Sequence, residues 1–187
     1  MQLDGNLLTF AKEGMGLDLG AIAKGYIADR IKDYLLEQGV KKRHHQPGRA
    51  NVLCVGEKPE GTPFKIGIQK PFADRSETIA VMNISDKSVV SSGIYERYFE
   101  KDGKIYHHIL NPATGYPYDN HLVSVTIISD KSVDGDGLST SCFALGLDKG
   151  MELINSLPDV QAVFITDDYE LHYSDGFEEE ISMADVK

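Results

Sequence analysis

The sequence has no tryptophan, only two cysteines, and no run of about 18 apolar residues such as a membrane-spanning helix requires. The last absence excludes a transmembrane helix. Zinc–thiolate sites usually take about four closely spaced ligands, so Cys54 and Cys142 are too few to form one. Both cysteines lie among apolar residues, which predicts buried thiols without a disulfide.

Positive charge is also scarce: 19 Lys and Arg residues stand against 29 Asp and Glu residues, a formal net charge of −10. This balance excludes a non-specific binder of nucleic acid or anionic membrane, because either polyanion would be repelled. A phosphate ligand would need a bound cation or a very local positive group. The hydrophobic share of 41% excludes wholesale disorder, and the length of 187 residues predicts a single domain over 1–187.

The spacing of apolar residues predicts an α+β fold with mixed or antiparallel sheets and a few helices, since strands and helices do not alternate regularly. Strands are predicted at Leu7–Phe10, Asn51–Val55, Phe64–Gln69, Thr78–Ile84, Ser88–Ser92, Tyr95–Phe99, Ile105–Leu110, Leu122–Ile128, Gln161–Thr166 and Glu170–Tyr173. Helices are predicted at Ala21–Gln38, Gly137–Leu145 and Lys149–Leu157. Gly39 is placed to end the first helix, and Asp102-Gly103 to form a tight hairpin turn.

The segment Arg43–Ala50 does not fit this pattern, because it is basic, rich in histidine and interrupted by Pro47. It could hold a metal through its histidine pair or grip a phosphate through its basic side chains. An exposed loop is the simpler interpretation, and we favour it.

A first group of candidate residues lies in Asp18–Tyr26, where a glycine turn leads into a helix. The backbone N–H groups at a helix N-terminus favour an anion, and Lys24 falls in the first helical turn, with Asp18 in the loop before it. The alternative is a capped helix with a solvated lysine. There is no Gly-Lys-Ser/Thr sequence, so the segment is not a P-loop.

A second group lies in Asp134–Ser141. Asp136 is placed to cap the helix that follows, with Ser139 and Thr140 one turn further on. One carboxylate and two hydroxyls are hard oxygen ligands, which suit Mg²⁺ or Ca²⁺, although the spacing is not that of an EF-hand. A helix cap with uninvolved hydroxyls is the alternative.

A third group lies in Tyr106–Pro117. His107 and His108 point to opposite faces of a strand, so at most one faces a given site. A histidine before a Pro/Gly turn suits a general base, because its pKa is near neutral. The alternative is a histidine that only satisfies structural hydrogen bonds.

Taken together and in this order, these segments resemble the FAD:protein FMN transferase (ApbE) family. The matching segments are Asp18–Gly25, Ser92–Arg97, His108–Gly115 and Asp136–Thr140. The resemblance extends over nearly the whole chain and implies an ApbE-like (T-fold-like) architecture. Family members usually have about 300 residues or more, so the resemblance implies an N-terminally truncated chain, the C-terminal portion of such a protein.

The resemblance also implies roles for particular residues. The flavin-binding positions of the family fall on Asp18, Lys24 and Leu110, the last through its backbone. The Mg²⁺ ligands fall on Ala21 (through its main-chain oxygen), Asp136, Ser139 and Thr140. The catalytic histidine falls on His108, and His107 has no role in the pattern.

The implied reaction is attack by a threonine hydroxyl of an acceptor flavoprotein on the FMN-side phosphate of FAD, with release of AMP. Two alternatives stay open: an FAD pyrophosphatase, in which water replaces the hydroxyl, and a flavin-binding module without turnover. Full-length family members are typically exported and anchored to the membrane by a lipid, which is the expected location here.

The chain departs from the family pattern at one point. Where the family usually ends a hydrophobic strand with Gly-Gly-Asn, this sequence has Arg49-Ala50-Asn51. We expect either a local frameshift or divergence in this segment.

Overall fold

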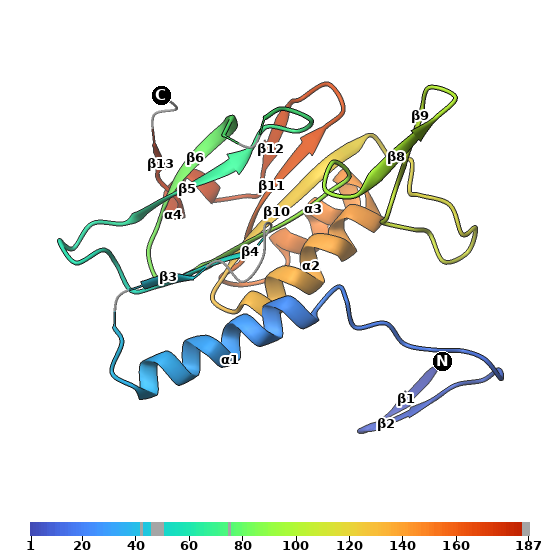
Figure 1. Cartoon of the computed structure of the whole chain (residues 1–187), viewed down its shortest axis with the longest axis horizontal. Coiled ribbons are helices and arrows are strands. Elements are labelled where there is room, and N and C mark those ends of the chain that lie inside the picture. Colours follow the sequence, from blue (N-terminus) through green and yellow to red (C-terminus); the bar gives the residue numbers. More distant parts are fainter. Residues whose placement is uncertain (42, 46–50, 75, 185–187) are drawn as a thin grey trace.

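The structure is a computed structural model that describes residues 1–41, 43–45, 51–74 and 76–184. A six-stranded antiparallel sheet forms its centre (Figure 1). In spatial order the strands are β12 (Leu171–Tyr173), β11 (Gln161–Thr166), β10 (Leu122–Ser129), β7 (Ser88–Gly93), β4 (Asn51–Val55) and β3 (Arg43–His45).

A second sheet and a group of helices cover the two faces of the central sheet. The second sheet contains β13 (Met183–Ala184), β6 (Thr78–Ile84) and β5 (Phe64–Gln69). The helices are α1 (Ala23–Glu37), α2 (Ser132–Leu145) and α3 (Leu147–Asn155), while the short α4 (Phe177–Glu180) precedes β13.

The hydrophobic core has two parts, one on each face of the central sheet. One part lies between the two sheets and includes Met82 and Ile165; the other lies between sheet and helices and includes Ile127 and Phe143. The central strand β10 is buried along its whole length, because neighbours cover both of its faces. This burial on both sides fixes α2 against β7 and β10.

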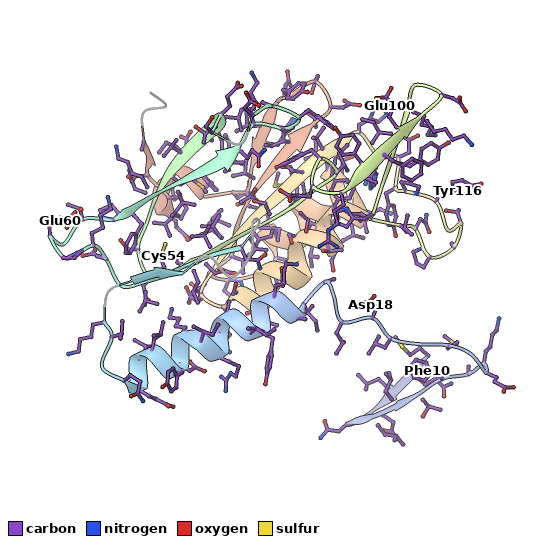
Figure 2. All side chains as sticks on the ribbon, viewed as in Figure 1. Phe10, Asp18, Cys54, Glu60, Glu100 and Tyr116 are labelled. Atoms are coloured by element: carbon purple, nitrogen blue, oxygen red, sulfur yellow. The ribbon has the colours of Figure 1, made fainter. Side chains whose placement is uncertain are left out.

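Two hairpins lie outside this layered body. One is formed by β1 (Gln2–Asp4) and β2 (Leu7–Thr9), the other by β8 (Tyr98–Lys101) and β9 (Lys104–His107). Figure 2 shows Phe10 at the first hairpin, well separated from the sheets. Apolar side chains are exposed both before α1 and on its outer face, among them Leu3, Leu17, Tyr26 and Ile27. Within the described ranges, no helix combines the length and hydropathy needed to span a bilayer.

Much of this architecture agrees with the sequence predictions. The α+β class with antiparallel sheets is confirmed, and four strands have the predicted bounds: Asn51–Val55, Phe64–Gln69, Thr78–Ile84 and Gln161–Thr166. Gly39 follows α1 with a φ of 80°, as expected for a glycine that ends a helix. Cys54 and Cys142 are free and buried as predicted, and burial raises the pKa of the Cys54 thiol to about 12.

Three predictions of secondary structure are wrong. The helix predicted at Gly137–Leu145 begins at Ser132, and Tyr95 lies in a turn before β8 instead of in a strand. The segment Arg43–Ala50 is not simply an exposed loop, because Arg43–His45 form β3 and pair with β4. The rest of that prediction, residues 46–50, lies outside the described residues. Backbone pairing with a neighbouring strand overrode the polar composition of Arg43–His45.

Candidate active site

Helices α1 and α2 cross in close contact near their N-termini. A Cβ atom on Gly25 would lie only 2.2 Å from the backbone oxygen of Ser132, a distance that no real Cβ makes. Only glycine therefore permits this crossing. The contact places the first matching segment, Asp18–Gly25, directly on the helix that carries the last one, Asp136–Thr140.

Each of these two helices is capped by an aspartate of the other. The Asp29 carboxylate of α1 accepts hydrogen bonds from the backbone N–H groups of Ser132 (2.8 Å) and Val133 (2.9 Å), at the start of α2. In return, Asp136 Oδ2 accepts the N–H of Gly25 at 2.5 Å, in the first turn of α1. These are N–H groups that a helix cannot satisfy internally. Asp136 thus lies inside α2 and caps α1, so the prediction that it caps its own helix is wrong.

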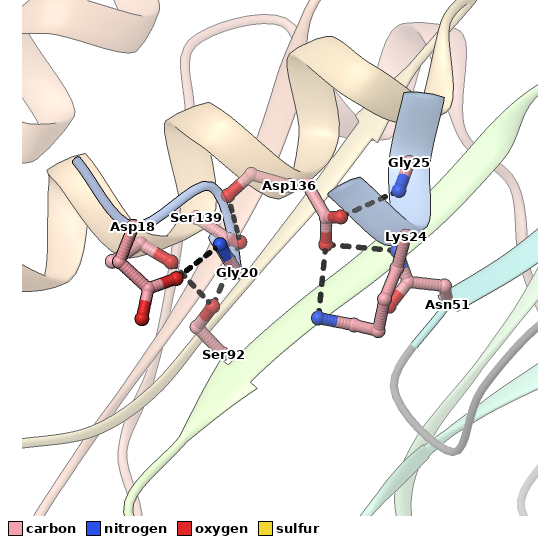
Figure 3. A network of polar contacts seen from close by, with 9 residues as sticks. Asp18, Gly20, Lys24, Gly25, Asn51, Ser92, Asp136 and Ser139 are labelled. Atoms are coloured by element: carbon pink, nitrogen blue, oxygen red, sulfur yellow. Dashed lines mark hydrogen bonds and ion pairs between the residues drawn. The ribbon is translucent and has the colours of Figure 1, made fainter. Parts of the chain in front are cut away.

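The Asp136 carboxylate has further donors around it (Figure 3). Asn51 Nδ2 donates to Asp136 Oδ1 at 2.9 Å, and Lys24 Nζ lies 3.7 Å from the same oxygen. The Asp136 side chain is 5% exposed, whereas that of Lys24 is 48% exposed. Gly25 and Asn51 hold the Asp136 carboxylate from inside the fold. The exposed Lys24 side chain has room to turn away from Asp136.

Hydroxyl groups from β7 and α2 lie one turn further along α2. Ser92 Oγ lies 2.8 Å from Ser139 Oγ and 3.2 Å from Thr140 Oγ1. Ser139 is buried and donates to the Asp136 carbonyl oxygen at 3.1 Å. The second matching segment, which begins at Ser92, therefore meets the last one here. Sequence reasoning did not assign Ser92 to the site, although its place at the head of a matching segment was a usable signal.

The cap from Asp136 also affects Ala21, the residue before the N-cap of α1. If α1 began one residue earlier, the Gly25 N–H would donate to the Ala21 carbonyl oxygen. Because Asp136 takes that N–H, the Ala21 oxygen is left without this helical partner. Asp18, in the preceding loop, is exposed and accepts the Gly20 N–H at 2.7 Å. The loop thus presents the Asp18 carboxylate and the Ala21 carbonyl near the start of α1.

The groups around Asp136 fit a hard divalent cation. In the described part of the chain, no cluster of three or more His, Cys, Asp or Glu side chains could hold a metal. The available donors are instead a carboxylate, hydroxyls and a main-chain oxygen, the ligand types that Mg²⁺ prefers. The buried amide oxygen of Asn51, next to Asp136, also has no hydrogen-bond partner among the described residues. The expected ligands Ala21, Asp136, Ser139 and Thr140 are of these types, and their role as ligands stays a prediction.

The two adjacent histidines have opposite environments. His107 is buried: its Nε2 lies 2.9 Å from the Tyr118 carbonyl, and its Nδ1 accepts the Ile109 N–H at 3.3 Å. A carbonyl oxygen only accepts, so Nε2 carries the proton and both ring nitrogens are used. Burial lowers the pKa of His107, which keeps the ring neutral. His107 is a structural residue.

His108 is exposed, and within the described ranges only one of its ring nitrogens has a hydrogen-bond contact. Its Nδ1 lies 3.2 Å from the Arg97 carbonyl oxygen, and its backbone N–H donates to the same atom. In the neutral tautomer that fits this contact, Nδ1 carries the proton and Nε2 has the lone pair. Leu110 follows on the same segment with 52% of its surface exposed, paired with Pro117. The segment His108–Gly115 is thus tied to the segment Ser92–Arg97 through Arg97. The segments Asp18–Gly25 and Asp136–Thr140 meet instead at Asp136.

Comparison with known proteins places this arrangement in a family. The ApbE family matches residues 1–164. A Klebsiella pneumoniae protein named FAD:protein FMN transferase is 52% identical over 153 residues, which are 82% of this chain and 46% of that protein. A Treponema pallidum protein of the same name is 37% identical over 185 residues, 95% of this chain and 51% of that protein. The crystal structure of an ApbE protein from Thermotoga maritima matches with a TM-score of 0.80 and 32% identity, over 89% of this chain and 54% of that one.

The fold and the donor set define an α+β domain with a group of oxygen donors near the N-termini of two packed helices. The comparisons add the family: the chain belongs to the ApbE family, as the sequence motifs indicated. It spans about half the length of the curated relatives it matches.

Proposed function

We propose that this chain carries the cation and flavin-phosphate site of a Mg²⁺-dependent FAD:protein FMN transferase. One observation supports this most directly: the first and last motifs meet at the Asp136 carboxylate, through the Gly25 N–H and the Lys24 ammonium group. Relatives named FAD:protein FMN transferase support the reaction type.

In this proposal, the cation is held by Asp136, Ser139, Thr140 and the Ala21 carbonyl oxygen. When bound, Mg²⁺ would neutralise charge on the pyrophosphate of FAD. Lys24 would turn from Asp136 toward the same phosphates, which its exposed side chain allows. Asp18 and the backbone of Leu110 would contact the flavin half of FAD. A protein with a net charge of −10 needs such local positive groups to bind a dinucleotide.

The transfer step joins the acceptor to the FMN-side phosphorus of FAD. The threonine hydroxyl oxygen bonds to that phosphorus, and the bond from the phosphorus to the bridging oxygen breaks. The bridging oxygen leaves with AMP, and FMN stays attached through a phosphoester. His108 takes the hydroxyl proton on Nε2, the ring nitrogen that its contact with Arg97 leaves free.

The acceptor is a flavoprotein subunit with a target threonine, and the location is the outer side of the membrane. Both are part of the proposal. If water replaces the hydroxyl, the same groups would hydrolyse FAD to FMN and AMP, so the experiment must separate transfer from hydrolysis.

The test is to incubate the chain with FAD and Mg²⁺, with and without a threonine-bearing acceptor domain. We expect flavin fluorescence on the acceptor after denaturing electrophoresis, together with AMP. AMP formed equally without acceptor would indicate a pyrophosphatase, and FAD retained without AMP would indicate a binding module. Either result would contradict the proposed transfer.

The Asp136→Ala variant tests the cation assignment. It removes the only carboxylate among the proposed ligands, so we expect metal-stimulated AMP release to disappear. Unchanged Mg²⁺ stimulation in this variant would contradict the assignment. The matched control is Asp134→Ala, which removes an exposed carboxylate two residues earlier in α2.

A further inference from the structure

Asn51, the first residue of β4, is completely buried beside Asp136. Its Nδ2 donates to Asp136 Oδ1 at 2.9 Å, while Asp136 Oδ2 accepts the Gly25 N–H. Each carboxylate oxygen therefore has a buried donor of its own. Two donors on two oxygens fix the rotation of the carboxylate as well as its position.

The other end of the Asn51 amide, the oxygen Oδ1, is in a different situation. Oδ1 is buried and has no hydrogen-bond partner among the described residues. Turning the amide over would place Oδ1 against a carboxylate oxygen, and two acceptors repel, so Asp136 fixes the orientation. A buried carbonyl oxygen without a donor is unfavourable and requires an explanation. Protein-bound Mg²⁺ usually keeps several waters, and such waters are donors.

We propose that Asn51 is a positioning residue for the cation. Nδ2 holds the Asp136 carboxylate in its ligating orientation, and Oδ1 accepts a hydrogen bond from a water of the hydrated cation. This inference rests on the proposed function, because it requires Asp136 to ligate Mg²⁺. Because Asn51 orients Asp136 and accepts from that water, its loss weakens cation binding.

The experiment compares Asn51→Leu with Asn83→Leu. Asn83, on β6, donates to Ser182 at 3.1 Å away from the proposed cation site, so the control removes the same type of side chain. Cation affinity is measured by Mg²⁺ calorimetry and by electron paramagnetic resonance with Mn²⁺ as probe, on protein whose folding is checked by circular dichroism. We expect Asn51→Leu to bind the cation about 10–100-fold more weakly, the usual effect of losing an outer-shell partner of a metal ligand. Asn83→Leu should bind like the wild type.

The outcomes separate this inference from the proposed function. If Asp136→Ala loses the cation while Asn51→Leu binds it like the wild type, the inference is overturned and the proposed cation site stands. If the wild type binds no cation, or Asp136→Ala binds it unchanged, both fail. Should Asn51→Leu not fold, Asn51→Ala takes its place, because it removes the same amide with a smaller side chain. An affinity between those of the wild type and Asp136→Ala then supports the inference, and a wild-type affinity overturns it.

Discussion

The α1–α2 junction and the segment that carries His108 differ in how the fold holds their side chains. At the junction, Asp29 and Asp136 each cap the opposite helix, and Asp136 is buried. His108 instead lies at the surface, held by a single carbonyl oxygen. The proposed cation ligand Asp136 thus also holds the two helices together. Within the described part of the chain, the proposed proton acceptor His108 makes no comparable contribution to the packing. Substitutions at the junction should affect folding and binding together, and those at His108 should affect activity alone.

The largest expected effect on stability comes from Gly25→Ala. The added methyl group would overlap the Ser132 backbone and push α1 away from α2. We expect the free energy of unfolding to fall by about 1–3 kcal/mol, a typical cost of overpacking. Urea denaturation measures it.

The matched control for this prediction is Gly137→Ala in α2. Its Cβ would meet only Ile22, at an ordinary 3.5 Å, and alanine favours a helix over glycine by about 1 kcal/mol. If both variants changed stability equally, the close contact between α1 and α2 would not explain why residue 25 is a glycine.

A smaller, pH-dependent effect is expected from His107. Burial lowers its pKa in the folded chain, while the unfolded chain titrates at about 6.5. As the pH falls below that value, the unfolded state binds a proton that the folded state does not, so stability decreases until the pH passes the folded pKa. We expect the wild type to lose more unfolding free energy between about pH 7 and pH 5 than His107→Gln. Parallel pH profiles would show that His107 is not responsible.

The smallest effect on stability, but a large one on activity, is expected from His108→Ala. An exposed substitution typically changes stability by less than about 0.5 kcal/mol. Loss of a general base should slow FMN transfer about 100-fold or more, with FAD affinity mostly unchanged. Transfer rates and FAD titrations measure the two effects. His121→Ala is the control, because this histidine is also exposed but pairs with Asp167; wild-type transfer by His108→Ala would exclude a catalytic role.

Sequence reasoning reached the proposed site residues only in part. Hydroxyl and carboxylate spacing suggested a cation near Asp136, and the family resemblance supplied Ala21 and His108. It did not find Asn51, Ser92 or the role of Asp29, whose partners lie on other elements. An asparagine at the start of an apolar strand was a signal for Asn51, but its partner is 85 residues away.

The α+β class, several strand bounds and the burial of both cysteines could be predicted from the sequence, because these depend on the local alternation of apolar and polar residues. The start of α2, the helix that Asp136 caps and the missing helical partner of the Ala21 oxygen instead depend on how α1 packs against α2. The Asp136–Gly25 hydrogen bond spans 111 residues, and the Asp29–Ser132 bond spans 103. Partners so far apart meet only when the sheet and helices pack, so no local pattern encodes them.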